Sequence, residues 1–505
     1  MSLLIAEYQT QRASLIGNDR SLRRENLTAG LRSDKEFEAD RIIRKIRALE
    51  AETIWKEEHP SIPHPFPGME FLTGRSIIVK TQLFEILSKM PKGALLHAHL
   101  DATVNAEFLL QLALKYPAMH VRIQQPLSPT NLSTNLPEFK CLPQDQFTDQ
   151  GSLTDALYTL GSWVSLHDAR ESFAPELGGK EGFDRWVIGS MTINPSEAYG
   201  THNTITKIWQ KFASTFVTST GLIRVAPIWE EYIREFFLTS IADGISYIEV
   251  RINFLYKFMY GADGRENVTH REWLVAVEKV MTEVKAELAQ QGRAGEFVGV
   301  KVIYSTIRFI TPEELKWYLE DCIALKKEFP HLIAGFDLVG DENVYKPLIY
   351  YAEALLRFRE RVEKEGLDIP FIFHAGETLG DGTEADENLY DAILLGTKRI
   401  GHGEKGIARL TSSMPMHPLP AVLNNGVPVV LCSDDPSVFG NMGLTFDYYQ
   451  VLAASEITGL STLGALARDS LEFSTLNGDD KRAALTEFER RWNEFIEYVV
   501  VEYGK

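Results

Sequence analysis

Cysteine is scarce in this chain of 505 residues. Only three are present, Cys141, Cys322 and Cys432, and they lie far apart in the sequence. An odd number of widely spaced cysteines does not build a disulfide framework. Because disulfides belong to oxidising compartments, this scarcity favours a reducing one.

Long hydrophobic runs and an excess of positive charge are missing as well. No stretch approaches the ~18 apolar residues of a membrane helix, and the N-terminal run MSLLIAEYQTQR is too short for a signal peptide. We therefore expect a cytoplasmic protein. The net charge of −18 disfavours nucleic acid and anionic membranes as partners, because phosphate binding needs clustered cations. A neutral or cationic small molecule is compatible with this charge.

The sequence predicts two parts. Residues 1–90 are mostly helical and charged, and Ser33 and Glu36 predict a capping box at the start of one helix. This N-terminal extension either packs on the main body as an appendage or serves as a dimerisation arm. Residues 91–505 are predicted to form one barrel domain. A lid-like insertion at about 115–205, rich in Ser, Thr, Asn, Pro and Gly, interrupts it after the first strand.

Seven apolar, β-branched runs have the length of strands. Helical patterns such as 312–327 and 344–365 lie between the later ones, and this alternation indicates a parallel sheet with crossover helices. Polar residues able to do chemistry stand at the C-terminal ends of several runs. That placement favours a TIM-type (β/α)₈ barrel over an open α/β sheet, because several strand ends then feed one site. The predicted strands are 94–99, 245–252, 298–305, 332–338, 370–374, 398–402 and 427–433.

The first of these runs ends in His97-Ala98-His99, and Asp101 follows. Alternate side chains of a strand share one face, so two imidazoles two residues apart can hold one metal ion. Two strand histidines can also occur together by chance, and this motif alone does not decide between the two interpretations.

Three later strand ends supply matching side chains. His374 is a candidate third metal ligand, and Glu377 after the intervening glycine is an acid/base candidate. His402 stands between two glycines and is suited to proton transfer on a water molecule. Asp434 and Asp435 are adjacent carboxylates, a costly arrangement unless a metal ion neutralises one of them. The Asp-Asp-Pro sequence could instead cap a helix.

Together these residues favour a catalytic metal site over a chance pair of strand histidines and a helix cap at Asp-Asp-Pro. Three histidines and one carboxylate make a mononuclear, zinc-type ligand set with room for water, and the spare glutamate, histidine and aspartate complete an inventory for metal-assisted hydrolysis. A dinucleotide fingerprint at 401–406 is weak, because the acidic residue expected about 20 positions later is missing. No C-x-x-C is present, which excludes the zinc deaminases that carry H-x-E with P-C-x-x-C.

From about Pro91 to the C-terminus the sequence resembles the adenosine/AMP deaminase family of the metal-dependent amidohydrolase superfamily. The resemblance is carried by five motifs in the family's order, MPKGALLHAHLDA, GFDLVGDE, FHAGE, RIGHG and SDDP. The long N-terminal segment and the insertion after HAHLDA look most like the adenosine deaminase growth factor (ADGF) subgroup. Members of that subgroup are usually secreted, and the lack of a signal makes this chain similar to an intracellular relative.

The resemblance implies roles in the reaction. Glu377 would donate a proton to N1 of a purine, and His402 would orient and help deprotonate the water that attacks C6. The implied reaction is hydrolytic deamination of adenosine, and of 2′-deoxyadenosine, to inosine and ammonia. One Zn²⁺ per chain would be held by His97, His99, His374 and Asp434.

The resemblance also implies how the substrate is bound. Asp435 would bond N7 of the purine, and the backbone of Gly340 would meet N3. Asp101 would face the ribose. Trp209, by a looser similarity, would line the sugar side. The implied partner is a small-molecule purine nucleoside, without nucleic acid or membrane, and a homodimer could form through the N-terminal extension.

The family's seventh strand has no counterpart in this sequence. Only 32 positions separate His402 from Asp434, whereas one strand–helix–strand step takes about 30 residues and a complete barrel needs two such steps here. We predict that one strand–helix unit is missing between His402 and Val427, a deletion of roughly two dozen residues. Because a barrel lacking a strand exposes two unpaired edges, we expect this shortened form to fold poorly.

Two other functions stay open at this point. The chain could deaminate adenine, AMP or an N6-modified purine nucleotide, although no P-loop or Lys/Arg cluster at the mouth supports a phosphate. It could also be a catalytically impaired member that acts by binding or signalling. Against that alternative, all presumed metal ligands and acid/base residues are present.

Overall fold

A parallel sheet of four strands forms one half of a barrel wall. Its order is β1 (Gly93–Leu95), β5 (Ile245–Asn253), β8 (Gly299–Ile307) and β9 (Ile333–Val339). These strands are buried on both faces, because helices cover the outside and the barrel interior fills the other side. The computed structural model describes residues 3–23, 25, 26, 33–202, 204–378, 380–403 and 413–504.

The wall continues through shorter pairings. An isolated parallel bridge joins Phe336 of β9 to Phe371. Next, β10 (His374–Ala375) pairs in parallel with β11 (Gly401–His402). A last parallel bridge between Ala98 and Asp434 closes the wall on the first strand. The chemically interesting residues therefore stand at one end of the barrel, as the sequence predicts.

Helices cover the outside of the wall, and their ends follow from local chemistry. Helix α11 (Pro312–Glu328) begins at a capping box of Thr311 and Glu314, with proline in its first turn. Its bounds agree with the predicted helix. The predicted helix over 344–365 begins later, because Pro347 precedes a short 3₁₀ turn, η8 (Leu348–Tyr351), and α12 (Ala352–Lys364) follows it.

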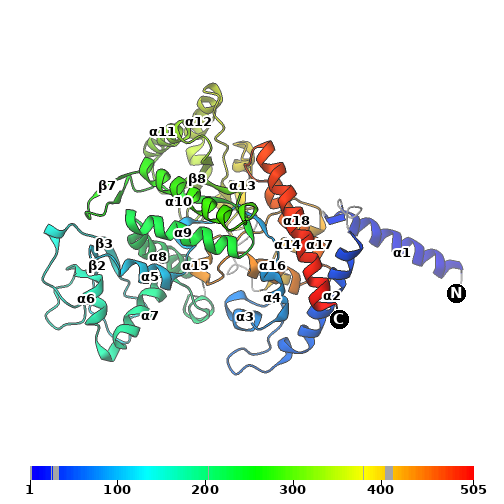
Figure 1. Cartoon of the computed structure of the whole chain (residues 1–505), viewed down its shortest axis with the longest axis horizontal. Coiled ribbons are helices and arrows are strands. Elements are labelled where there is room, and N and C mark those ends of the chain that lie inside the picture. Colours follow the sequence, from blue (N-terminus) through cyan, green and yellow to red (C-terminus); the bar gives the residue numbers. More distant parts are fainter. Residues whose placement is uncertain are drawn as a thin grey trace.

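The N-terminal extension has two unlike helices. Helix α1 (Leu3–Ser21) extends away from the rest of the chain (Figure 1). Helix α2 (Asp34–Glu52) begins at Ser33, whose side chain accepts from the Glu36 N–H. It packs against the two C-terminal helices, α17 (Leu460–Glu472) and α18 (Gly478–Tyr503). In α2, Arg47 donates to backbone carbonyls of residues 452, 455 and 458, which ties the helix to the barrel domain.

The insertion after the first strand forms its own small sheet. Strands β2 (Met119–Arg122), β3 (Glu138–Cys141) and β4 (Val164–Ser165) are antiparallel in the order β3-β2-β4. Helices α6 (Leu166–Glu171) and α7 (Gly179–Met191) follow, and α8 (Ile205–Ile223) returns to the barrel. Helix α8 contacts the short η3 turn (Leu100–Ala102), so the insertion reaches the end of the barrel that carries the histidines.

The predicted strand at 427–433 is not formed. Among the described residues, 427–433 carry no strand ladder, and those between β11 and this segment form only the 3₁₀ turn η9 (Met414–Met416) and the short helix α14 (Leu419–Asn424). The predicted strands at 94–99, 370–374 and 398–402 are also shorter than expected. The run at 398–402 has one ladder neighbour among the described residues, the two-residue β10, and a strand without a continuous partner is shortened.

The remaining elements complete the helical layer. In the part of the chain that the structure describes, no helix is both long enough and apolar enough to cross a bilayer. The three cysteines are free. The other elements are η2 (Ile54–Lys56), α3 (Phe71–Ile78), α4 (Gln82–Ser88), α5 (Ala106–Ala113), η4 (Gln144–Gln146), η5 (Pro175–Leu177), η6 (Glu197–Thr201), α9 (Ala226–Ala242), β6 (Phe258–Tyr260), β7 (Glu266–Thr269), α10 (His270–Gln290), η7 (Ala294–Glu296), α13 (Glu384–Leu394), η9 (Met414–Met416), α15 (Pro436–Phe439) and α16 (Thr445–Ala453).

Candidate active site

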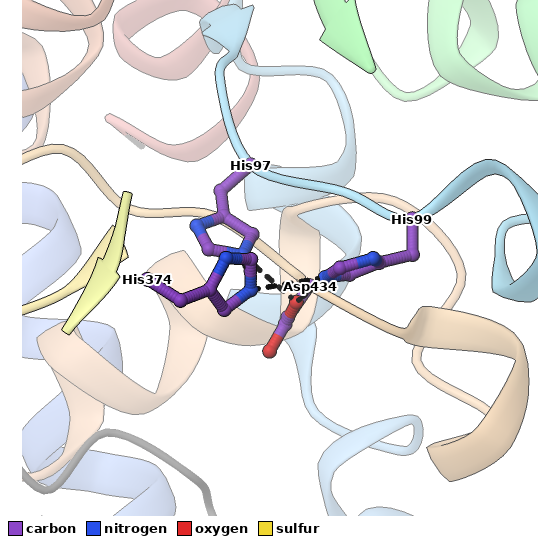
Figure 2. A group of neighbouring side chains, drawn as sticks. All are labelled: His97, His99, His374 and Asp434. Carbon is purple, nitrogen blue, oxygen red and sulfur yellow. Dashed lines mark hydrogen bonds and ion pairs between the residues drawn. The ribbon is translucent and has the colours of Figure 1, made fainter. Parts of the chain in front are cut away.

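Four side chains from three separate stretches of the chain meet at one point (Figure 2). The Nε2 atoms of His97 and His99 lie 3.1 and 3.2 Å from Nε2 of His374. The Oδ1 atom of Asp434 lies 3.2 Å from His97 Nε2 and 3.4 Å from His99 Nε2. The structure therefore brings together the whole predicted ligand set.

The spacing of these atoms fits a tetrahedral cation site. Four ligands at ~2.1 Å from a central ion stand ~3.4 Å from one another, close to the distances observed. Burial lowers the pKa of His97 and His374 well below the usual range, and lowers the pKa of His99 to about 3. The rings are neutral at pH 7, which is the form that binds metals. Three neutral ring nitrogens and a carboxylate oxygen facing one another repel unless a cation lies between them.

Backbone strain is concentrated at the same place. His402 (φ 68°) and Asp434 (φ 55°) both adopt the left-handed conformation that non-glycine residues avoid. Only one other non-glycine residue of the described chain has a positive φ. Such strain persists where the surroundings impose it, and it is common at functional sites. Here it turns both side chains toward the histidine cluster.

A buried carboxylate orients His374. Its Nδ1 lies 2.7 Å from Oδ2 of Asp337, and its backbone N–H donates to Oδ1 of the same residue. Arg251 donates to Asp337 from the other side at 2.7 Å. This contact fixes the proton on Nδ1 and leaves the Nε2 lone pair free for a metal. The sequence analysis assigned no role to Asp337 or Arg251, although charged residues within otherwise buried strands are a signal that could have found them.

Glu377 is buried close to the cluster. Burial, followed by the charges of Asp434 and Glu342, raises the pKa of the Glu377 carboxyl well above its usual range. A carboxyl in this condition carries its proton at neutral pH and can act as a general acid.

Glu342 holds the turn on which Glu377 stands. Its carboxylate accepts from the backbone N–H of Glu377 at 3.0 Å and from that of Gly376 at 3.3 Å. Asn388 donates to it at 2.7 Å, and the fully buried Arg308 guanidinium lies 3.5 Å away. The motif GFDLVGDE contains Glu342, but the sequence alone gave no reason to separate it from the neighbouring acidic residue.

His402 lies between Glu377, the predicted acid, and Asp434, one of the predicted metal ligands. Its Nε2 is 3.6 Å from Oε2 of Glu377 and 3.8 Å from Oδ2 of Asp434. Burial lowers the pKa of His402 to about 3, so its imidazole is neutral and free to accept a proton. The preceding Gly401 packs against His97, because a Cβ there would lie 2.5 Å from the His97 ring.

The four predicted substrate-binding residues differ in their surroundings. Asp435 is buried, and burial followed by the charges of Asp434 and Asp101 raises its pKa. Burial also raises the pKa of Asp101, to about 6. Gly340 ends β9 with φ 112°. Trp209 is buried, and its ring stands edge-on to Phe212 with the centroids 5.4 Å apart. The ring that contacts His99 is Phe216.

Comparisons with known proteins agree with this site. The family model described as adenosine deaminase matches residues 193–411. Adenosine deaminase 2 of Sus scrofa is 31% identical, over 85% of this chain and 84% of the relative. Adenosine deaminase of Aedes albopictus is 26% identical over 535 aligned positions, covering 98% of this chain and 90% of the relative.

Solved structures support the fold. The adenine deaminase of Arthrobacter aurescens has a TM-score of 0.51 and 17% identity, covering 80% of this chain and 99% of that one. The N6-mAMP deaminase of Arabidopsis has a TM-score of 0.51 and 16% identity, with the same coverage. A Burkholderia amidohydrolase solved with bound Zn has a TM-score of 0.50 and 14% identity, covering 83% and 95%. The predicted barrel fold is confirmed, and with its assembled ligand cluster this chain belongs to the adenosine deaminase family of aminohydrolases.

Proposed function

We propose that this chain hydrolyses adenosine, and 2′-deoxyadenosine, to inosine and ammonia, with one Zn²⁺ held by the His97, His99, His374 and Asp434 cluster. The observation that carries the proposal is the pair of Glu377 and His402 beside that cluster. Their side chains lie 3.6 Å apart; burial raises the pKa of Glu377 well above its usual range and lowers the pKa of His402 to about 3, so one group is suited to give a proton and the other to accept one. Hydrolytic deamination needs both at once.

His97, His99, His374 and Asp434 would hold the ion, which when bound would make a water molecule nucleophilic at neutral pH and neutralise negative charge. Neutral His402 accepts a proton from the attacking water. Protonated Glu377 donates its proton to N1 as the bond between C6 and the water oxygen forms. The hydroxyl proton at C6 then passes to the Glu377 carboxylate, and His402 gives its proton to the exocyclic nitrogen. The bond between C6 and that nitrogen breaks, ammonia leaves, and both residues are back in their starting forms.

Asp435 supports recognition of the purine. Its Oδ1 is buried and has no hydrogen-bond donor among the described residues. With its pKa raised, the carboxyl can keep a proton and donate it to N7, an acceptor in the adenine ring. An unpaired buried carboxyl is costly without such a ligand.

The arginines around the site favour a nucleoside over a nucleotide. Arg251 is paired with Asp337, Arg308 lies beside Glu342, and Arg399 with Glu249. These buried cations are already neutralised, so they are poor candidates for a 5′-phosphate. AMP and N6-methyl-AMP remain the second candidates, because a solved structure of similar fold is an N6-mAMP deaminase.

A substrate panel tests the proposal. The Zn²⁺-loaded protein is assayed by ammonia release with adenosine, 2′-deoxyadenosine, adenine, AMP and N6-methyl-AMP. We expect kcat/KM for adenosine to exceed that for either nucleotide by at least tenfold. A preference for AMP or N6-methyl-AMP would overturn the nucleoside assignment. Bound zinc with no turnover of any purine would overturn the enzymatic one.

A further inference from the structure

One buried arginine lies where the metal cluster and the predicted acid meet. Arg308 directly follows β8, and its side chain is fully buried. A buried guanidinium is costly unless polar or charged partners surround it. The ion pair with Glu342 balances its charge, but the direction of its other N–H groups needs a separate explanation.

The guanidinium of Arg308 binds three neighbouring segments at once. Its Nε donates to the backbone carbonyl of Leu338 in β9 at 3.0 Å. Its Nη2 donates to the backbone carbonyl of His374 in β10, and its Nη1 lies 3.5 Å from Oε2 of Glu342. Because the guanidinium is planar and its N–H groups point in fixed directions, these contacts fix the spacing between the three segments.

The backbone of Arg308 is held as well. Its N–H donates to the carbonyl of Val339 at 3.0 Å. Its own carbonyl accepts from the Tyr351 hydroxyl at 2.6 Å and from the Lys346 N–H at 3.2 Å. The side chain therefore starts from a fixed point, and a side chain of another shape cannot recover the same contacts through a small backbone shift.

His374 depends on side chains because its strand is short. In the described chain, the last backbone hydrogen bond from β9 to this segment joins the Phe336 carbonyl to the Ile372 N–H at 3.0 Å. At His374 two side chains take the place of such bonds. Its N–H donates to Asp337, and its carbonyl accepts from Arg308. Asp337 thus orients the ring of this metal ligand, and Arg308 holds the peptide that follows it.

A second branch leads from Arg308 to Glu377. The Glu342 carboxylate is fully buried and accepts from the backbone N–H groups of Gly376 and Glu377. Asn388 adds a neutral hydrogen bond to it, and Arg308 supplies the countercharge. Because a buried carboxylate is stable only with such a partner, Arg308 acts on the turn of Glu377 through Glu342.

We propose that Arg308 is a positioning residue that sets the separation between the metal ligand His374 and the general acid Glu377. One planar group holds the carbonyl of His374 directly and the turn of Glu377 through Glu342. The role of Glu377 as the acid rests on the proposed function, whereas the link to His374 rests on contacts alone. A change at Arg308 therefore disturbs metal binding and catalysis together, and a change at Glu342 disturbs catalysis alone.

Arg308→Lys tests this directly, because lysine keeps the charge and loses the planar fork. We expect its zinc affinity, measured by competition with a chromogenic chelator, to fall by about tenfold, as when other groups that orient a metal ligand are removed. Its kcat on adenosine should fall at least tenfold, with KM changed less than threefold. Glu342→Gln should lower kcat in the same way and leave zinc affinity within twofold. Parent-like zinc affinity in Arg308→Lys would overturn the proposal.

A double variant separates positioning from stability. Removing one partner of a buried ion pair leaves the other charge unpaired and lowers stability. The combination of Arg308→Met with Glu342→Gln removes both charges, so its Tm should exceed that of Arg308→Met by several degrees. Its zinc affinity and kcat should stay as low as in Arg308→Lys. If both recover together with the Tm, Arg308 only balances charge and the proposal fails. The double variant and Glu342→Gln differ only at position 308, so their zinc affinities decide the question even if Arg308→Met alone does not fold.

The matched control is Arg47→Lys. Arg47 also donates to several backbone carbonyls, those of residues 452, 455 and 458, but it lies in α2, which packs on the C-terminal helices. This variant should have a lower Tm with unchanged zinc affinity and kcat. An equal fall in zinc affinity in both lysine variants would reflect stability alone and would overturn the proposal. Zinc affinity is measured without a purine, so it tests Arg308 even if the parent protein turns over no adenosine, a result that would overturn the proposed function instead.

Discussion

At the scale of single residues, the site depends on a carboxyl that is kept from ionising. Glu377 is buried, and after burial the carboxylates of Asp434, Glu342 and Asp341 raise its pKa. We predict that Glu377→Gln lowers kcat on adenosine by about 10²–10⁴-fold, because the amide cannot donate an acidic proton to N1. Bound zinc should stay at one per chain, measured by elemental analysis. Loss of the metal in this variant would mean that Glu377 is a ligand instead.

The same carboxyl predicts a pH dependence. The acid form is the active one, so kcat should fall as the pH rises through the raised pKa of Glu377. Removing the negative charge of Glu342 takes away one cause of the raised pKa. In Glu342→Gln this alkaline decline should therefore begin at lower pH than in the parent protein. A decline that stays at the same pH would show that Glu342 does not act on Glu377 electrostatically.

Glu342 also acts through geometry. Its carboxylate accepts from two successive backbone N–H groups, those of Gly376 and Glu377. In Glu342→Gln one oxygen becomes an NH₂ group that faces donors, so we expect kcat to fall at least tenfold while KM changes less than threefold. The matched control is Glu353→Gln, whose carboxylate is 80% exposed beside Arg357; we expect its steady-state kinetics to equal those of the parent.

At the scale of elements, the motifs at the ends of strands predicted the site accurately, whereas the bounds of the strands were predicted less well. The motifs at 97–101, 374–377, 401–403 and 434–435 could be assigned because hydrolytic chemistry needs particular side chains at particular spacings. Asp337, Arg251, Arg308 and Glu342 could not be assigned, because their roles depend on contacts between β5, β8, β9 and the turn after β10. A charged residue inside a buried strand signals that a partner exists, but the sequence does not say which residue that partner is.

The same dependence on contacts between elements explains the errors in the predicted strands. Runs such as 245–252 and 298–305 were predicted nearly to the residue, because β5 and β8 have neighbours on both sides. The run at 427–433 has the same composition but forms no ladder in the described chain. A strand is completed by its partner's N–H and C=O groups, so composition alone cannot predict one where the partner is missing.

The contact between β9 and β10 predicts a metal-affinity effect. Asp337 fixes the proton of His374 on Nδ1, and removing such a partner typically weakens a metal site by about 10–100-fold. We expect Asp337→Asn to lower zinc affinity by that factor in competition with a chromogenic chelator. The matched control is Asp321→Asn, because Asp321 makes a similar 2.7 Å contact with His270 away from the site. Equal zinc affinity in the two variants would contradict the role of Asp337.

At the scale of the whole molecule, the N-terminal extension and the barrel share one body through α2, whereas α1 extends beyond it. Dimerisation through this extension and a cytoplasmic location stay predictions. The barrel itself is closed at its weakest point by the bridge between Ala98 and Asp434. That bridge lies next to the histidine cluster, whose members come from both sides of the closure.

A metal ion bound there should therefore stabilise the closure of the barrel. A ligand at a concentration of 1,000 times its Kd stabilises a folded state by about 4 kcal/mol. Here the bound ion would link residues 97–99 and 374 to the weakly paired segment that ends at residue 434. We predict that removing zinc with a chelator lowers the Tm by several degrees and speeds proteolysis within 413–434, and that adding zinc reverses both. His97→Ala should abolish the zinc dependence, whereas the control His167→Ala, an exposed histidine, should keep it. If the Tm does not change with zinc, zinc binding does not stabilise this closure, even if the loaded enzyme is active.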